Sequence, residues 1–142
     1  SLLRDRFWWI RDTLDESLMQ EGAKLLIGEH DFNSFRASSC QAFSPIRTIK
    51  TLDIQRNDQF LIISIKANSF LQKMVRNIVG SLVHIGLREK TNDWLIDVLE
   101  VRDRKRAGIT APSHGLYLIE VDYPKNYEIP KIDNRDIFMH MV

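Results

Sequence analysis

Polar side chains interrupt the most apolar helical stretch of this 142-residue chain. Residues 68–86 read NSFLQKMVRNIVGSLVHIG, with Lys73, Arg76 and Asn77 set among aliphatic residues. An arginine guanidinium is a planar fork of N–H donors that fits a carboxylate or a phosphate, and a lysine adds a point charge. These residue types indicate either recognition of an anionic group or an ordinary solvated helix face.

Helical spacing places Arg76 on a narrow polar stripe. At about 100° per residue, the positions of Phe70, Met74, Ile78, Leu82 and Ile85 centre a broad apolar arc. The stripe consists of Gln72, Lys73, Arg76, Gly80 and His84. A glycine inside a helix lowers stability by about 1 kcal/mol relative to alanine, which indicates a close approach by another backbone or a ligand at this stripe. Spacing alone favours a surface arginine, with Ser69 as the helix cap.

Other basic residues follow the same part of the chain. Lys66 and Asn68 end a predicted strand, and Arg104 lies in the run RDRKR at 102–106. Alternating bases suit RNA phosphates, but cations also gather at helix C-termini. Residues 66–106 hold nine Lys or Arg against five acids, while the net charge of the chain is only +1. A polyanion partner and a solvated surface are both compatible with this distribution.

Periodicity predicts an α+β fold. Residues 14–27 have helical spacing and Gly28 follows them, whereas residues 29–45 read as a loop whose aromatic residues either anchor it or stack on bases. These aromatics are Phe32, Phe35 and Phe43. Residues 48–55 and 60–68 form a predicted hairpin, 91–101 a further helix, 107–115 a loop and 116–123 a last strand before a tail along the surface. We expect an antiparallel sheet with helices packed on one face and the other face forming a cleft, onto which Ser64, Lys66 and Asn68 project.

Composition restricts the class of protein. With 44% apolar and 27% charged residues, the chain is long enough for one globular domain. It has a single cysteine, Cys40, and neither a secretory leader nor an apolar run of membrane-spanning length. His84 and His114 have no Asp or Cys partner at useful spacing, so we expect them to be structural. The expectation is a cytoplasmic protein, and the start at Ser1 suggests a fragment.

Three separate motifs carry a resemblance to a known family. The run KANSFLQKMVRNIVGSL is preceded by GEHDFNSFR and followed by DRKRAGITAPSHGLYLIEVDYP. In this order and spacing, residues 14–124 resemble the C-terminal half of the tRNA pseudouridine synthase A family. The resemblance implies isomerisation of uridine to pseudouridine in the anticodon stem-loop of tRNA, without a metal or organic cofactor, by a cytoplasmic homodimer.

The resemblance also implies roles for individual residues. Arg76, in the MVRN motif, is expected to pair with an aspartate nucleophile, and Leu116 to pack against the target base. Without the resemblance, Leu116 reads as an ordinary core residue. Lys66, Asn68, Lys73 and Arg104 are the expected substrate-binding residues.

The aspartate nucleophile itself has no counterpart in the sequence. In the family it lies in an arginine-aspartate-glycine-valine-histidine type of loop, and no aspartate from Asp5 to Asp136 has that context. We therefore expect residues 1–142 to be a C-terminal domain that is inactive alone. A stand-alone RNA-binding module or a dimerisation module without catalysis is the alternative.

Overall fold

The computed structural model describes residues 8–37, 40, 42–58, 60–101 and 110–112, and the backbone of 116–117 and 137–141. These residues include three α-helices, a short 3-10 helix and five strands, with the segments that connect them. In chain order they are α1 (Glu16–Leu26), β1 (Gly28–Asp31), η1 (Asn33–Phe35), β2 (Ile46–Asn57), β3 (Phe60–Ala67), α2 (Met74–Gly86), α3 (Asn92–Val101), β4 (Leu116–Tyr117) and β5 (Ile137–Met141).

The strands form one antiparallel sheet in the order β1-β2-β3-β5-β4. The predicted hairpin is its centre, with Leu52 opposite Ile65 and Ile54 opposite Ile63. Along β3, Leu61, Ile63 and Ile65 are buried, while the alternate residues are half-buried. This two-residue period confirms that one sheet face covers the core.

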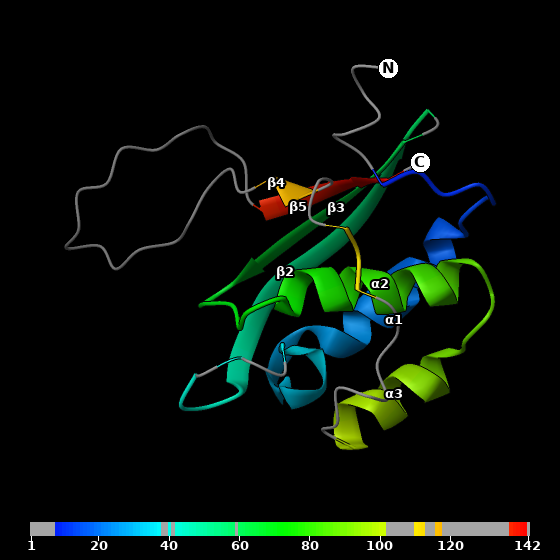
Figure 1. The fold of residues 1–142 in the computed structure, drawn as a ribbon. Coiled ribbons are helices and arrows are strands. Elements are labelled where there is room, and N and C mark those ends of the chain that lie inside the picture. The colour runs from blue at the N-terminus through cyan, green and yellow to red at the C-terminus, as the bar shows by residue number, and fades with distance from the viewer. Residues whose placement is uncertain are drawn as a thin grey trace.

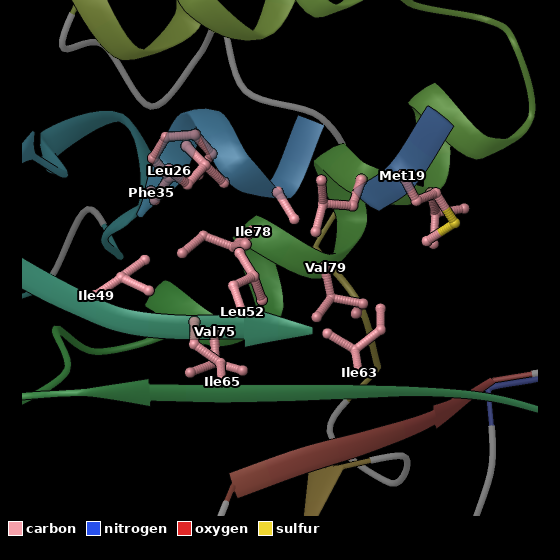
Figure 2. Packing of buried hydrophobic residues seen from close by; sticks show 14 of the residues in the cluster. Met19, Leu26, Phe35, Ile49, Leu52, Ile63, Ile65, Val75, Ile78 and Val79 are labelled. Atoms are coloured by element: carbon pink, nitrogen blue, oxygen red, sulfur yellow. The ribbon is translucent and has the colours of Figure 1, made fainter. Parts of the chain in front are cut away.

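All three helices lie on the same side of the sheet (Figure 1). Met19 and Leu26 of α1 and Ile78 and Val79 of α2 pack with Ile49 and the other buried sheet residues (Figure 2). Helix α3 contacts α1 and η1, so it forms an outer layer. The predicted α+β class with helices on one face is confirmed, whereas a cleft on the other face stays a prediction. No helix in the described ranges is both long and apolar enough to cross a bilayer.

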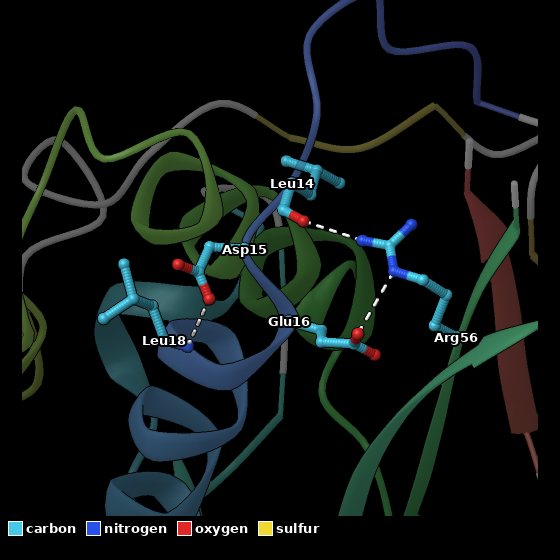
Figure 3. Close-up of polar contacts among 5 residues, drawn as sticks. All are labelled: Leu14, Asp15, Glu16, Leu18 and Arg56. Atoms are coloured by element: carbon cyan, nitrogen blue, oxygen red, sulfur yellow. Dashed lines mark hydrogen bonds and ion pairs between the residues drawn. The ribbon is translucent and has the colours of Figure 1, made fainter.

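Helix α1 begins at a side-chain cap, which Figure 3 shows. The Asp15 carboxylate accepts a hydrogen bond from the Leu18 N–H at 3.2 Å. Arg56 of β2 joins this helix start to the sheet, since it donates to the Leu14 carbonyl and pairs with Glu16 at 3.2 Å. Local capping and long-range pairing therefore fix the same end of α1.

Helix α2 begins later than its apolar spacing predicts. Lys73 has a left-handed backbone with φ of 62°, so the regular helix starts at Met74, and Phe70 precedes it. Ser69 is not a cap; its N–H donates to the Asn68 Oδ1 at 2.9 Å. The apolar residues before Met74 are placed by the core rather than by a helical turn, a distinction that side-chain spacing does not encode.

Three expectations for the connecting segments need correction. Residues 29–31 are not loop; with Gly28 they form the edge strand β1, because they find backbone partners along β2. Phe43 does not anchor the loop, since its side chain is fully exposed, whereas Phe32 and Phe35 are buried as expected. Residues 137–141 do not run along the surface as tail; they form β5 between β3 and β4, satisfying the backbone groups of the β3 edge.

Candidate active site around Arg76

Arg76 lies in the first turn of α2, half-buried, and is joined twice to residue 111. The Ala111 N–H donates to the Arg76 carbonyl at 3.0 Å, and the Arg76 Nε donates to the Ala111 carbonyl at 2.7 Å. This backbone contact is made at Arg76, whereas the close approach predicted at Gly80 stays a prediction. The contact at Arg76 fixes one edge of the guanidinium within the protein.

Asn77 holds the neighbouring residue of the same segment. Its Oδ1 accepts a hydrogen bond from the Thr110 Oγ1 at 2.6 Å, and its Nδ2 donates to the Phe35 carbonyl at 2.7 Å. Asn77 is not among the predicted site residues. A signal was present, because position 77 lies seven residues after Phe70 and three after Met74, so it falls on the apolar arc, where an asparagine must find buried partners.

No carboxylate in the described part of the chain pairs with Arg76. The ion pairs found there join Arg56 to Glu16 and Arg88 to Asp15, and the Glu89 carboxylate contacts the His84 ring. With Nε bonded to Ala111, a carboxylate would meet the end of the guanidinium formed by Nη1 and Nη2, which can donate two parallel hydrogen bonds. The geometry of this site can therefore bind and orient an anion brought from elsewhere.

The two lysines predicted to bind the substrate lie on different elements. Lys66 is in β3, and Lys73 is in the turn before α2. Lys73 is exposed at the turn before α2, and the Ala37 N–H donates to the carbonyl of the preceding Gln72 at 2.9 Å. Lys66 is half-buried on the sheet face opposite the helices, in register with Thr51 of β2. The described contacts do not bring either lysine to Arg76.

Asn68 closes the end of the β2–β3 hairpin. Its Oδ1 accepts hydrogen bonds from the Thr48 N–H at 3.0 Å and the Ser69 N–H at 2.9 Å, and its own N–H donates to the Thr48 carbonyl. These bonds give Asn68 a structural role at the strand end.

Leu116 and Arg104, the last two predicted site residues, lie partly or wholly outside the described residues. Leu116 lies in β4 in register with Met139, but its side chain is outside the described part, as are Arg104 and His114 altogether. The partner of His84 is a glutamate: its Nδ1 lies 2.7 Å from the Glu89 Oε2, and its ring meets Trp94 edge-on. These contacts support the structural role expected for His84.

The Cys40 thiol lies beside the turn that precedes α2. The pKa of the Cys40 thiol is lowered by backbone N–H groups of Ala42 and then Gln72, with smaller contributions from Arg36 and Arg47. Positive groups that stabilise a thiolate favour other anions in the same way.

A separate hollow lies on the helix side of the sheet. Its volume is about 350 Å³, and none of its lining residues is a predicted site residue. The lining consists of Leu25, His30, Asp31, Ile96, Leu99 and Glu100. The predicted site is therefore not at this hollow.

Comparisons with known proteins agree with the motifs. A sequence profile described as tRNA pseudouridine synthase matches residues 23–124. A tRNA pseudouridine synthase A of Colwellia psychrerythraea is 52% identical over 83% of this chain and 46% of its own length, and that of Coxiella burnetii is 45% identical over 98% and 53%. The corresponding protein of Shewanella denitrificans is 44% identical over 97% and 53%. The chain spans about half the length of these relatives. The matched profile covers most of residues 1–142 and includes the helix of Arg76 and the segment that holds it, and the chain belongs to the tRNA pseudouridine synthase family.

Proposed function

We propose that this chain is the C-terminal domain of a tRNA pseudouridine synthase A, which isomerises uridine in the anticodon stem-loop. Arg76 carries the proposal. It is half-buried and held through Nε by Ala111, and within the described residues no carboxylate pairs with it. An arginine that is oriented in this way is suited to a carboxylate supplied by another segment of the whole protein.

In the proposed reaction, Arg76 pairs with an aspartate from the N-terminal half of the protein. The guanidinium keeps this carboxylate ionised and aims it at the flipped nucleotide, because a neighbouring positive charge lowers a carboxyl pKa. The glycosidic bond between the ribose C1′ and N1 of the base breaks, the base turns, and a bond forms between C1′ and carbon 5. Carbon 5 then loses its proton and N1 gains one, so the reaction is an isomerisation. Leu116 packs against the base, and no metal or organic cofactor takes part.

The remaining site residues are proposed to bind the tRNA. Lys66, Lys73 and Arg104 are suited to phosphate groups, and the exposed position of Lys73 supports its role. Asn68 would donate to a phosphate through its Nδ2 group, because its Oδ1 already accepts from two backbone N–H groups. We further propose that the whole protein is a cytoplasmic homodimer.

Pseudouridine formation by two forms of the protein tests the proposal. The full-length protein should convert uridine in unmodified tRNA, whereas residues 1–142 alone should give the blank rate because the nucleophile is missing. Circular dichroism should first establish that the shorter chain is folded. Turnover by residues 1–142 would place the nucleophile in this chain, and an inactive full-length protein that still binds tRNA would favour an RNA-binding module.

A further inference from the structure

Asn77 is completely buried, and both ends of its side-chain amide are hydrogen-bonded. A backbone carbonyl can only accept, so the NH₂ group must face Phe35, and the amide oxygen must face the Thr110 hydroxyl. The orientation of the amide is therefore unambiguous. The hydroxyl of Thr110 is then required to be the donor.

The two partners of Asn77 differ in how firmly they are held. Phe35 ends η1 and its side chain is fully buried in the core, so its carbonyl is a fixed point. Thr110 is half-buried and begins the segment 110–112, which belongs to neither a helix nor a strand. Asn77 thus ties this segment to the core.

The same segment determines where the Arg76 guanidinium points. Arg76 and Asn77 are successive residues of α2, and they bond successive residues, Ala111 and Thr110. An arginine side chain has many rotamers, so the direction of its fork depends on what holds Nε. Here that group is the Ala111 carbonyl, 2.7 Å away. A shift of Ala111 would rotate the edge formed by Nη1 and Nη2.

We propose that Asn77 and Thr110 are positioning residues for the isomerisation: their hydrogen bond fixes Ala111, and Ala111 orients Arg76 towards the carboxylate. This inference rests on the function proposed for Arg76. Neither residue touches the reacting atoms in this scheme. Loss of their bond should therefore lower the rate of the chemical step and leave the affinity for tRNA unchanged.

Thr110→Val in the full-length protein is the first test, because it removes the hydroxyl and keeps the side-chain shape. We expect kcat to fall about tenfold to a hundredfold, the scale that follows a small misplacement, with KM for tRNA near wild type. Tm should fall as well, because the buried Asn77 Oδ1 loses a hydrogen-bond donor. Thr110→Ser, which restores the hydroxyl, should recover most of the rate. Ser81→Ala is the matched structural control: Ser81 is buried and donates to the Asn77 backbone carbonyl, so its loss should lower Tm and spare kcat.

Arg76→Lys supplies a test that a merely structural role would not pass. Lysine has no fork to orient, so Thr110→Val should cost about twofold or less in that background, although it costs tenfold or more in wild type. Equal losses in both backgrounds would overturn the proposal. An unchanged kcat for Thr110→Val would also overturn it, as would a raised KM alone, since that result means contact with RNA.

An NMR signal separates this inference from the proposed function. The Arg76 Nε–H should give a protected resonance in the full-length protein that Thr110→Val broadens or shifts and Thr110→Ser retains. If the full-length protein forms no pseudouridine, the function proposed for Arg76 fails, and the resonance still decides whether Thr110 orients the guanidinium. A resonance unaffected by Thr110→Val means that it does not.

Discussion

Arg76 combines a structural contact with the proposed catalytic one. Its Nε bond to Ala111 holds a connecting segment, while the other end of the guanidinium presents the two-pronged donor edge that we propose binds a carboxylate. Asn77 also makes more than one contact, since its buried side-chain amide joins η1, α2 and the segment 110–112. In the proposed scheme, different atoms of the Arg76 side chain serve stability and activity, so the two effects should be separable.

Arg76→Ala in the full-length protein should separate the two effects. Losing a hydrogen bond from a charged donor lowers the free energy of unfolding by about 1.5–3 kcal/mol. Turnover should fall by about a hundredfold or more, the scale for losing one preorganised partner of a developing or fixed charge. Arg76→Lys should recover only part of the rate, because a point charge lacks the fork.

Single-turnover rates and thermal unfolding of the three proteins check this expectation. If Arg76→Ala stays folded and keeps near wild-type turnover, Arg76 is a structural residue only. If it unfolds the protein at room temperature, the bond to Ala111 contributes far more to stability than a single charged hydrogen bond does.

At the scale of elements, α1 and the end of α2 pack closely at Gly86. A Cβ built on Gly86 would lie 2.6 Å from the Met19 Sδ and 3.2 Å from the Leu14 Cδ2. Gly86→Ala should therefore lower the free energy of unfolding by about 1–3 kcal/mol, the usual cost of overpacking. Gly22→Ala is the matched control: its nearest neighbour would be the Ile85 Cδ1 at 3.1 Å, so a smaller loss is expected. Urea unfolding measures both, and equal stabilities would contradict the close contact.

The start of α1 should depend on pH through Asp15. A hydrogen bond from Arg88, and then one from the Leu18 N–H, lower the pKa of Asp15 below its ordinary value. A lowered pKa in the folded state means that the stabilisation is complete above the ordinary aspartate pKa of about 3.9 and is lost as pH falls through the folded value. Asp15→Asn keeps a good N-cap but should flatten the fall in Tm below about pH 4.

Tm measured from pH 6 to pH 2.5 for wild type and Asp15→Asn tests this reading. Arg88→Gln, which removes the main cause of the shift, should also reduce the acid dependence. An unchanged slope in both variants would mean that Asp15 does not stabilise the fold through its charge.

For the whole molecule, charge distribution matters more than net charge. The chain carries only +1, yet its bases concentrate between residues 66 and 106. If these bases contact tRNA, binding by residues 1–142 should be weak and should fall with salt, with a log–log slope of about −0.9 for each duplex phosphate neutralised. Filter binding across a range of KCl concentrations measures the slope. Tight binding that is insensitive to salt would contradict a phosphate-dominated surface.

The sequence by itself determined the family, the α+β class, the helices near 14–27 and 91–101, and the β2–β3 hairpin. Each of these depends on residues close together in the chain: a motif, a helical spacing, or alternation such as that of Leu61, Ile63 and Ile65. Local spacing encodes which face of an element is apolar, and burial of that face packs the element against the core.

Only the tertiary structure decided the start of α2, the placement of β5 and the partners of Asn77. The left-handed Lys73, the pairing of residues 137–141 with β3, and the bonds from Asn77 to Phe35 and Thr110 join groups far apart in the chain or override a local preference. A buried amide needs a partner, but spacing does not say which distant backbone supplies it. The candidate site around Arg76 forms where those long-range bonds meet. The sequence therefore predicted its residue types, but not their geometry.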